Sequence, residues 1–142
     1  MKLSEHFTLA ELTVTGTGIP NPPSREEVEA LRALCVNVLQ PLRDHVRVPI
    51  VVSSGFRSAK VNAAVGGAPS SQHRFGQAAD INAAGIGPRA LCRTIIDLGL
   101  PFDQLIQEFG RWVHVSYGPR HRRQVLTAVK QGGRTVYLPG LV

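Results

Sequence analysis

The feature that most constrains the fold is an apolar stripe in the first third of the chain, at residues 25–44. Its apolar side chains recur at three- and four-residue steps, the spacing of one helix face: Val28, Leu31, Cys35, Val38 and Leu42. Ser24 precedes the stripe and Glu27 follows three residues later, which is the pattern of a capping box. The sequence therefore predicts a long helix that buries one face, with Pro41 as the candidate for a kink near its end.

Shorter segments follow this helix. Strands are predicted at 50–53, 77–82, 104–109 and 112–117, and helical segments at 58–65 and 87–99. Residues 124–138 contain Gln131-Gly132-Gly133-Arg134, a favourable hairpin turn between two further strands. The order of helix, strand, helix and then a group of adjacent strands predicts an α+β fold, with helices packed on a mostly antiparallel sheet.

The composition is that of one globular domain spanning residues 1–142. The apolar fraction is 43% and the mean hydropathy is zero, so a core is expected without disulfide bonds. Cys35 and Cys92 lie inside apolar stretches and lack metal-binding spacing, which predicts small core residues. The charged N-terminus does not resemble a signal peptide, and no segment is apolar enough to span a membrane. We therefore expect a protein that is cytoplasmic at synthesis.

The net charge of +6 predicts attraction to polyanions such as nucleic acid, anionic lipid or cell wall. The excess of positive charge lies late in the chain, on Arg111, Arg120, Arg122, Arg123, Lys130 and Arg134. This segment fits a solvated basic surface or a polyanion-binding role equally well. Because aromatic residues are few and scattered, a stacking platform for nucleic acid is not expected.

Two side chains able to bind a metal stand seven residues apart, His73 and Asp80. A turn at Gly76 would fold the imidazole back toward a strand that presents the carboxylate. Taken alone, the pair fits an ordinary loop histidine and turn aspartate as well as a metal site. His114 is a candidate third ligand, because strand alternation places it with Ser116 on one face and its valine neighbours on the other.

Glu108 is the candidate catalytic carboxylate beside this third ligand. If residues 110–112 form a three-residue loop, Glu108 pairs with His114 across a hairpin; a two-residue loop would instead place it opposite Val113. The first register separates core and polar faces better. Alternatively, Glu108 forms a surface salt bridge with Arg111.

Two histidines and one aspartate leave the fourth position of a tetrahedral zinc ion open for water, as catalytic zinc requires. A free carboxylate nearby can accept that water's proton, so the residues form a coherent hydrolase site. The chain has no glycine-rich phosphate loop, no Gly-x-Ser-x-Gly motif and no histidine near either cysteine in the sequence.

Several motifs together resemble a known family. They are SGFRS at 54–58, Asn62, Gly66-Gly67, the SxHxxGxAxD pattern at 71–80, Glu108 and Trp112-Val113-His114. They resemble the M15-like zinc peptidases of peptidoglycan stem peptides, which include D-Ala-D-Ala carboxypeptidases and phage L-alanyl-D-glutamate endopeptidases. Their fold is shared with the Hedgehog signalling domain.

The resemblance covers residues 7–117 and implies a role for each matching position. His73, Asp80 and His114 match the zinc ligands, and Glu108 matches the catalytic base. Arg57 and Ser71 match substrate-binding residues. In many relatives the base stands three residues before the last histidine; here that residue is Arg111, and Glu108 stands six before it.

We therefore expect a monomeric zinc D-Ala-D-Ala carboxypeptidase that acts on the peptidoglycan stem peptide, without an obligate nucleic acid partner. Two alternatives stay open: an endopeptidase of the phage-lysin kind, and a non-catalytic zinc-containing module for wall binding or assembly. The expected protein reaches the cell wall after release from the cell or as a phage or prophage product.

Overall fold

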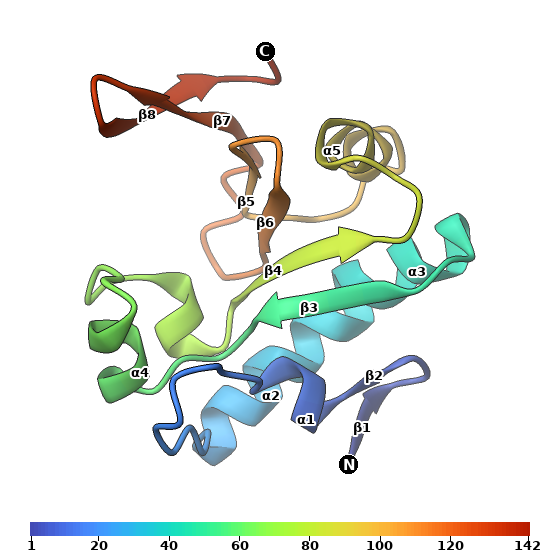
Figure 1. Cartoon of the computed structure of the whole chain (residues 1–142). Coiled ribbons are helices and arrows are strands. Elements are labelled where there is room, and N and C mark those ends of the chain that lie inside the picture. The colour runs from blue at the N-terminus through green and yellow to red at the C-terminus, as the bar shows by residue number, and fades with distance from the viewer.

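A six-stranded sheet with the strand order β3-β4-β6-β5-β7-β8 forms the centre of the structure (Figure 1), a computed structural model that describes all 142 residues. The strands are β3 (Ile50–Ser54), β4 (Ala78–Ala83), β5 (Gln104–Glu108), β6 (Trp112–Ser116), β7 (Gln124–Gln131) and β8 (Arg134–Pro139). All neighbours are antiparallel except β5 and β7, which are parallel. The expected α+β fold with a mostly antiparallel sheet is confirmed.

The remaining elements are helical, apart from a two-stranded hairpin at the N-terminus. They are β1 (Lys2–Ser4), β2 (Phe7–Thr8), α1 (Leu9–Leu12), α2 (Arg25–Leu34), η1 (Cys35–Leu39), α3 (Gln40–Val46), α4 (Ala59–Ala64), η2 (Gln72–Phe75) and α5 (Pro88–Asp97). No helix is both long enough and apolar enough to cross a membrane.

The long helix predicted at 25–44 consists of α2, η1 and α3 in succession. It begins at the predicted capping box, in which the Ser24 hydroxyl accepts from the Glu27 amide and the Glu27 carboxylate accepts from the Ser24 amide. The section η1 is a π-helix that ends at Leu39, two residues before Pro41 in the first turn of α3. Because proline lacks an N–H and crowds the preceding turn of an α-helix, the wider π-helical turn accommodates it.

One face of the sheet packs against the helices and forms the core. The core cluster contains 23 buried residues, including Ala79 and Ile81 of β4 and Val113 and Val115 of β6. Side chains from α2, η1 and α5 complete it: Leu31, Leu34, Cys35, Leu91, Cys92 and Ile95. Both cysteines are free and fully buried, which confirms them as core residues, and burial raises the pKa of each thiol to about 12.

The other face of the sheet carries the candidate site. Asp80 pairs with His114 across β4 and β6, and His114 pairs with Ile106 of β5. Alternation along each strand therefore sends these side chains away from the core. The hairpin β7–β8 continues the sheet beyond β5 and extends away from α2 and α3 (Figure 1).

The turn between β5 and β6 differs from both registers considered above. Its loop residues are 109–111, so Glu108 pairs with Trp112 rather than with His114 or Val113. Phe109 is a half-buried turn residue with φ +58°, not a core residue, and Gly110 follows with φ +68°. Two successive positive φ values make the tight turn that sequence spacing did not predict. Because the shift from the favoured register is two residues, Glu108 still lies on the same face as His114.

Candidate metal centre

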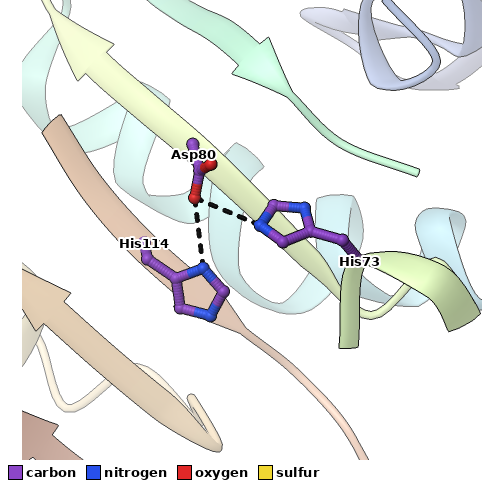
Figure 2. A group of neighbouring side chains, drawn as sticks. All are labelled: His73, Asp80 and His114. Atoms are coloured by element: carbon purple, nitrogen blue, oxygen red, sulfur yellow. Dashed lines mark hydrogen bonds and ion pairs between the residues drawn. The ribbon is translucent and has the colours of Figure 1, made fainter. Parts of the chain in front are cut away.

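Three metal-binding side chains converge on the open face of the sheet, from three separate elements (Figure 2). His73 comes from η2, Asp80 from β4 and His114 from β6. All three are buried, and one ligand atom from each lies within 4.8 Å of the others. The structure thus brings together the residues that the sequence selected as candidate ligands.

The distances within this cluster fit a small tetrahedral cation. Oδ1 of Asp80 lies 3.2 Å from Nε2 of His73 and 3.1 Å from Nδ1 of His114. Zinc ligands at about 2.0–2.1 Å from the metal are separated from one another by about 3.3 Å in a regular tetrahedron. Two imidazoles and a carboxylate are also the donor types that zinc accepts, so the residues fit the ion in both geometry and chemistry.

The orientation of the His73 ring is fixed from behind by the backbone. Its Nδ1 lies 2.7 Å from the carbonyl oxygen of Gly55, so Nδ1–H donates there and Nε2 points toward Oδ1 of Asp80 in the cluster. A Cβ at Gly55 would lie 2.3 Å from the carbonyl oxygen of Leu12, a separation that no side chain permits. The glycine in SGFRS therefore lets α1 approach closely while its own carbonyl orients a candidate ligand.

The turn that presents His73 also depends on close packing. The Ser71 hydroxyl accepts from the His73 amide at 3.3 Å and caps η2. Gly76 ends the turn with φ +72°, and a Cβ there would lie 2.7 Å from the carbonyl oxygen of Glu27. A residue with a side chain would be strained at this position and would push η2 away from α2.

Asp80 is buried yet held as an anion. Burial alone would raise its pKa, but hydrogen bonds from His114 and His73, together with their charges, bring the pKa well below its usual range. The anionic form in which a carboxylate binds a metal is therefore favoured at this position.

The cluster lies in a cavity of about 410 Å³ whose lining includes the other predicted site residues. Glu108, Arg57 and Ser71 all line it. Burial raises the pKa of Glu108. The negative charge of Asp80 also raises it, whereas the charges of His114 and Arg57 lower it by less than these two effects together. None of the ion pairs in the structure involves Glu108, so the proposed salt bridge with Arg111 is not formed.

Arg57 is positioned by several contacts at the edge of the cavity. Its Nη2 lies 3.6 Å from Oδ2 of Asp80, the oxygen that does not contact the histidines. Its Nε donates to the Ser54 hydroxyl at 3.1 Å, and Nη1 donates to Asn62 at 3.4 Å. Arg57 thus pairs with an acid and also lines the cavity.

Residues that the sequence analysis did not select also line this cavity. Tyr137 of β8 shares a row with Glu108, because Glu108 pairs with Ala128 of β7 and Ala128 pairs with Tyr137. The side chain of Gln72 donates to Asp103, which also accepts from Arg122. Tyr137 could be placed only from the parallel β5–β7 pair, and Gln72 only from its contact with Asp103, 31 positions away in the sequence. Neither contact leaves a local pattern in the sequence.

A buried two-histidine, one-aspartate cluster beside a free carboxylate defines a candidate metal-dependent hydrolase. Comparison with known proteins makes the class specific. The chain belongs to the peptidase M15 family, whose sequence profile matches residues 5–116, and the resemblance inferred from the motifs is confirmed.

A segment of the chain is also similar to a curated protein, the zinc D-Ala-D-Ala carboxypeptidase of Streptomyces albus G. The two are 49% identical over 45 residues, which is 32% of this chain and 18% of that protein. The match thus spans less than a fifth of the relative's length.

Proposed function

We propose that this protein is a zinc-dependent peptidase of peptidoglycan stem peptides, with D-Ala-D-Ala carboxypeptidase activity and the Hedgehog/DD-peptidase fold. The observation that carries the proposal is the placement of three ligand atoms within 4.8 Å of one another, in a cavity that Glu108 also lines. Family membership and the name of the carboxypeptidase relative support zinc as the metal and a peptide as the substrate.

The metal would be held by Nε2 of His73, Nδ1 of His114 and Oδ1 of Asp80, the atoms that face one another. A bound zinc ion supplies a Lewis acid and lowers the pKa of water. Gly55 fixes the His73 tautomer, and Arg57 faces the second oxygen of Asp80. These outer contacts hold the donors in place before any metal arrives.

Glu108 would act as the general base. Its raised pKa brings the carboxylate closer to the range in which it can accept a proton from the attacking water and later give it to the leaving amine. The β5–β6 register supports this role, because it places Glu108 on the site face two residues along β5 from Ile106, the partner of His114.

Arg57 would bind the terminal carboxylate of the peptide. Its guanidinium lines the cavity and is held by Ser54 and Asn62, so its donors are oriented before the substrate binds. The Ser71 hydroxyl, which accepts from the His73 amide, keeps its own proton to donate to a peptide carbonyl.

The testing experiment is mass spectrometry of purified muropeptides incubated with zinc-loaded protein. We expect loss of the terminal D-alanine. Glu108→Gln should retain zinc and fold but lower the rate about 10²-fold or more, the typical contribution of a general base. Glu29→Gln, which changes an exposed glutamate on α2, is the matched control and should match the parent.

Each other outcome has a defined meaning. Cleavage of an internal bond would replace the carboxypeptidase by an endopeptidase. Full zinc content without any cleavage would support a non-catalytic wall-binding module. Near-parent hydrolysis by Glu108→Gln would show that another group supplies the base.

A further inference from the structure

The segment that joins β6 to β7, residues 117–123, carries much of the late positive charge of the chain. Two of its residues, His121 and Arg123, have positive φ values of 43° and 50° although neither is glycine. Such conformations are strained for residues with a side chain and persist only where the surroundings fix them.

Contacts made by three consecutive residues hold this segment in place. The His121 ring packs edge to face on Tyr117 with the ring centroids 5.5 Å apart. Arg122 forms an ion pair with the fully buried Asp103 at 3.0 Å, and its backbone amide donates to the same carboxylate at 2.8 Å. Arg123 lies over the ring of Phe102 and donates to a backbone carbonyl at 3.1 Å. The segment is thus anchored at successive positions.

Arg120 is the exception within this anchored segment. It is exposed, it forms no ion pair, and its side chain lines the same cavity as the metal-binding cluster. The charge of Arg122 is balanced by Asp103, and Arg57 faces Asp80. Arg120 is therefore the cavity-lining arginine whose charge no carboxylate of the protein balances.

Arg57 and Arg120 line the same cavity from two distant parts of the chain. Arg57 follows β3 at one edge of the sheet, whereas Arg120 lies between β6 and β7. The cluster residues Asp80 and His114 line the same cavity. If Arg57 holds the terminal carboxylate of the leaving D-alanine, a second carboxylate that reaches Arg120 belongs to the part of the peptide N-terminal to the scissile bond.

We propose that Arg120 is a specificity residue that binds a second, internal carboxylate of the peptide substrate, N-terminal to the scissile bond. This inference rests on the proposed function and deepens it. A guanidinium pairs with a carboxylate through two parallel N–H donors. If the carboxylate of the substrate is amidated, it loses its negative charge and one of its two acceptor oxygens, so the pair is weaker. Two sources in a stem peptide supply this chemistry: the α-carboxylate of a γ-linked D-glutamate and the extra carboxylate of a diaminopimelate.

The test uses pentapeptides that end in D-Ala-D-Ala and differ in one group at a time. In one pair the D-glutamate α-carboxylate is free or amidated; in a second pair the diaminopimelate carboxylate is free or amidated. Hydrolysis by the zinc-loaded parent is expected to favour the free acid of one pair about tenfold in kcat/KM, mainly through KM. The pair that shows this preference identifies the source of the carboxylate.

In Arg120→Ala the ratio of kcat/KM for the free acid to kcat/KM for the amide should fall toward one. Arg120→Lys should restore part of it, because lysine keeps the charge but lacks the two-donor geometry. The control is Arg111→Ala, an exposed arginine outside the cavity that should keep the parent ratio. Matching melting temperatures of the variants would show that the folds are equal.

Equilibrium binding of the same peptides to zinc-loaded Glu108→Gln separates this inference from the proposed function. If no peptide is hydrolysed by the parent but the acid still binds about tenfold more tightly than the amide, only the proposed activity fails. An unchanged acid-to-amide ratio in Arg120→Ala would overturn the inference. It would also be overturned if the parent showed no preference in either pair, or if Arg120→Ala weakened binding of acid and amide equally.

Discussion

Two buried aspartates contact consecutive residues of η2, but different side chains stabilise their charges. Asp80 contacts His73, and Asp103 contacts Gln72. Both are buried, and both have a pKa below the usual range. For Asp80 the stabilising partners are two histidines, which outweigh the opposing effect of burial. For Asp103 the largest cause is the hydrogen-bonded side chain of Arg122, which lowers the pKa to about 2.

The difference between the partners separates a metal site from a structural ion pair. Imidazole nitrogens can offer lone pairs to a cation, so the cluster at Asp80 can bind a metal. A guanidinium cannot be deprotonated in a protein and has no acceptor, so the pair of Asp103 with Arg122 excludes a cation. An aspartate carboxylate therefore serves metal binding at Asp80 and anchors the segment 117–123 at Asp103.

The largest expected effect is on metal binding. Asp80→Ala should weaken zinc affinity about 10³-fold or more, because loss of one of three direct ligands exceeds the 10–100-fold cost of losing an outer partner. His73→Ala and His114→Ala should behave in the same way. Competition with a chelator of known affinity measures the effect.

The control for this prediction is Asp103→Asn, which leaves all three candidate ligands in place. Its zinc affinity should fall by no more than about tenfold to 100-fold, since Gln72 loses a partner next to His73. Equal losses in Asp80→Ala and Asp103→Asn would erase the distinction between the two sites. Near-full occupancy in every ligand variant would remove the metal assignment.

The next effect is on stability. Asp103→Asn in metal-free protein should lower the free energy of unfolding by about 3 kcal/mol, the lower end of the cost of breaking a buried ion pair. The lower end applies because the Arg122 side chain is 31% exposed and can turn to water. Urea unfolding measures this loss, with Asp97→Asn, an exposed residue at the end of α5, as the control. A cost below about 1 kcal/mol would mean that Asp103 is not the main anchor of its loop.

Local patterns in the sequence predicted most elements of the fold. The helix from Ser24, the strands β3, β4 and β6, and the Gly132-Gly133 turn all follow from spacing, capping and turn chemistry over short distances. The three candidate ligands were found because His73 and Asp80 are close in sequence and His114 lies on a strand of clear alternation.

Features that depend on long-range pairing were not predicted. The parallel contact of β5 with β7 has no local signal, and it places Tyr137 in the cavity. The ion pair of Asp103 with Arg122 joins residues 19 positions apart, in a segment whose basic residues fitted a solvated surface equally well. The β5–β6 turn was misjudged because Phe109, a bulky residue, adopts a positive φ that propensity disfavours.

The smallest expected effect is on the pH dependence of stability. The folded-state pKa of Asp103 is about 2, below its ordinary value of 3.8, so the carboxylate stabilises the fold above pH 4 and this stabilisation is lost as the pH falls through the folded-state value. Ionisation of Asp103 contributes about 2 kcal/mol to the free energy of unfolding, relative to the protonated carboxyl group. About 1 kcal/mol of this contribution should be lost between pH 5 and pH 3. Asparagine does not titrate, so the stability difference between parent and Asp103→Asn should narrow by that amount. Urea unfolding of both metal-free proteins at the two pH values measures it, because carboxylates common to both largely cancel. A difference that stays constant from pH 5 to pH 3 would show that Arg122 does not hold Asp103 in its anionic form.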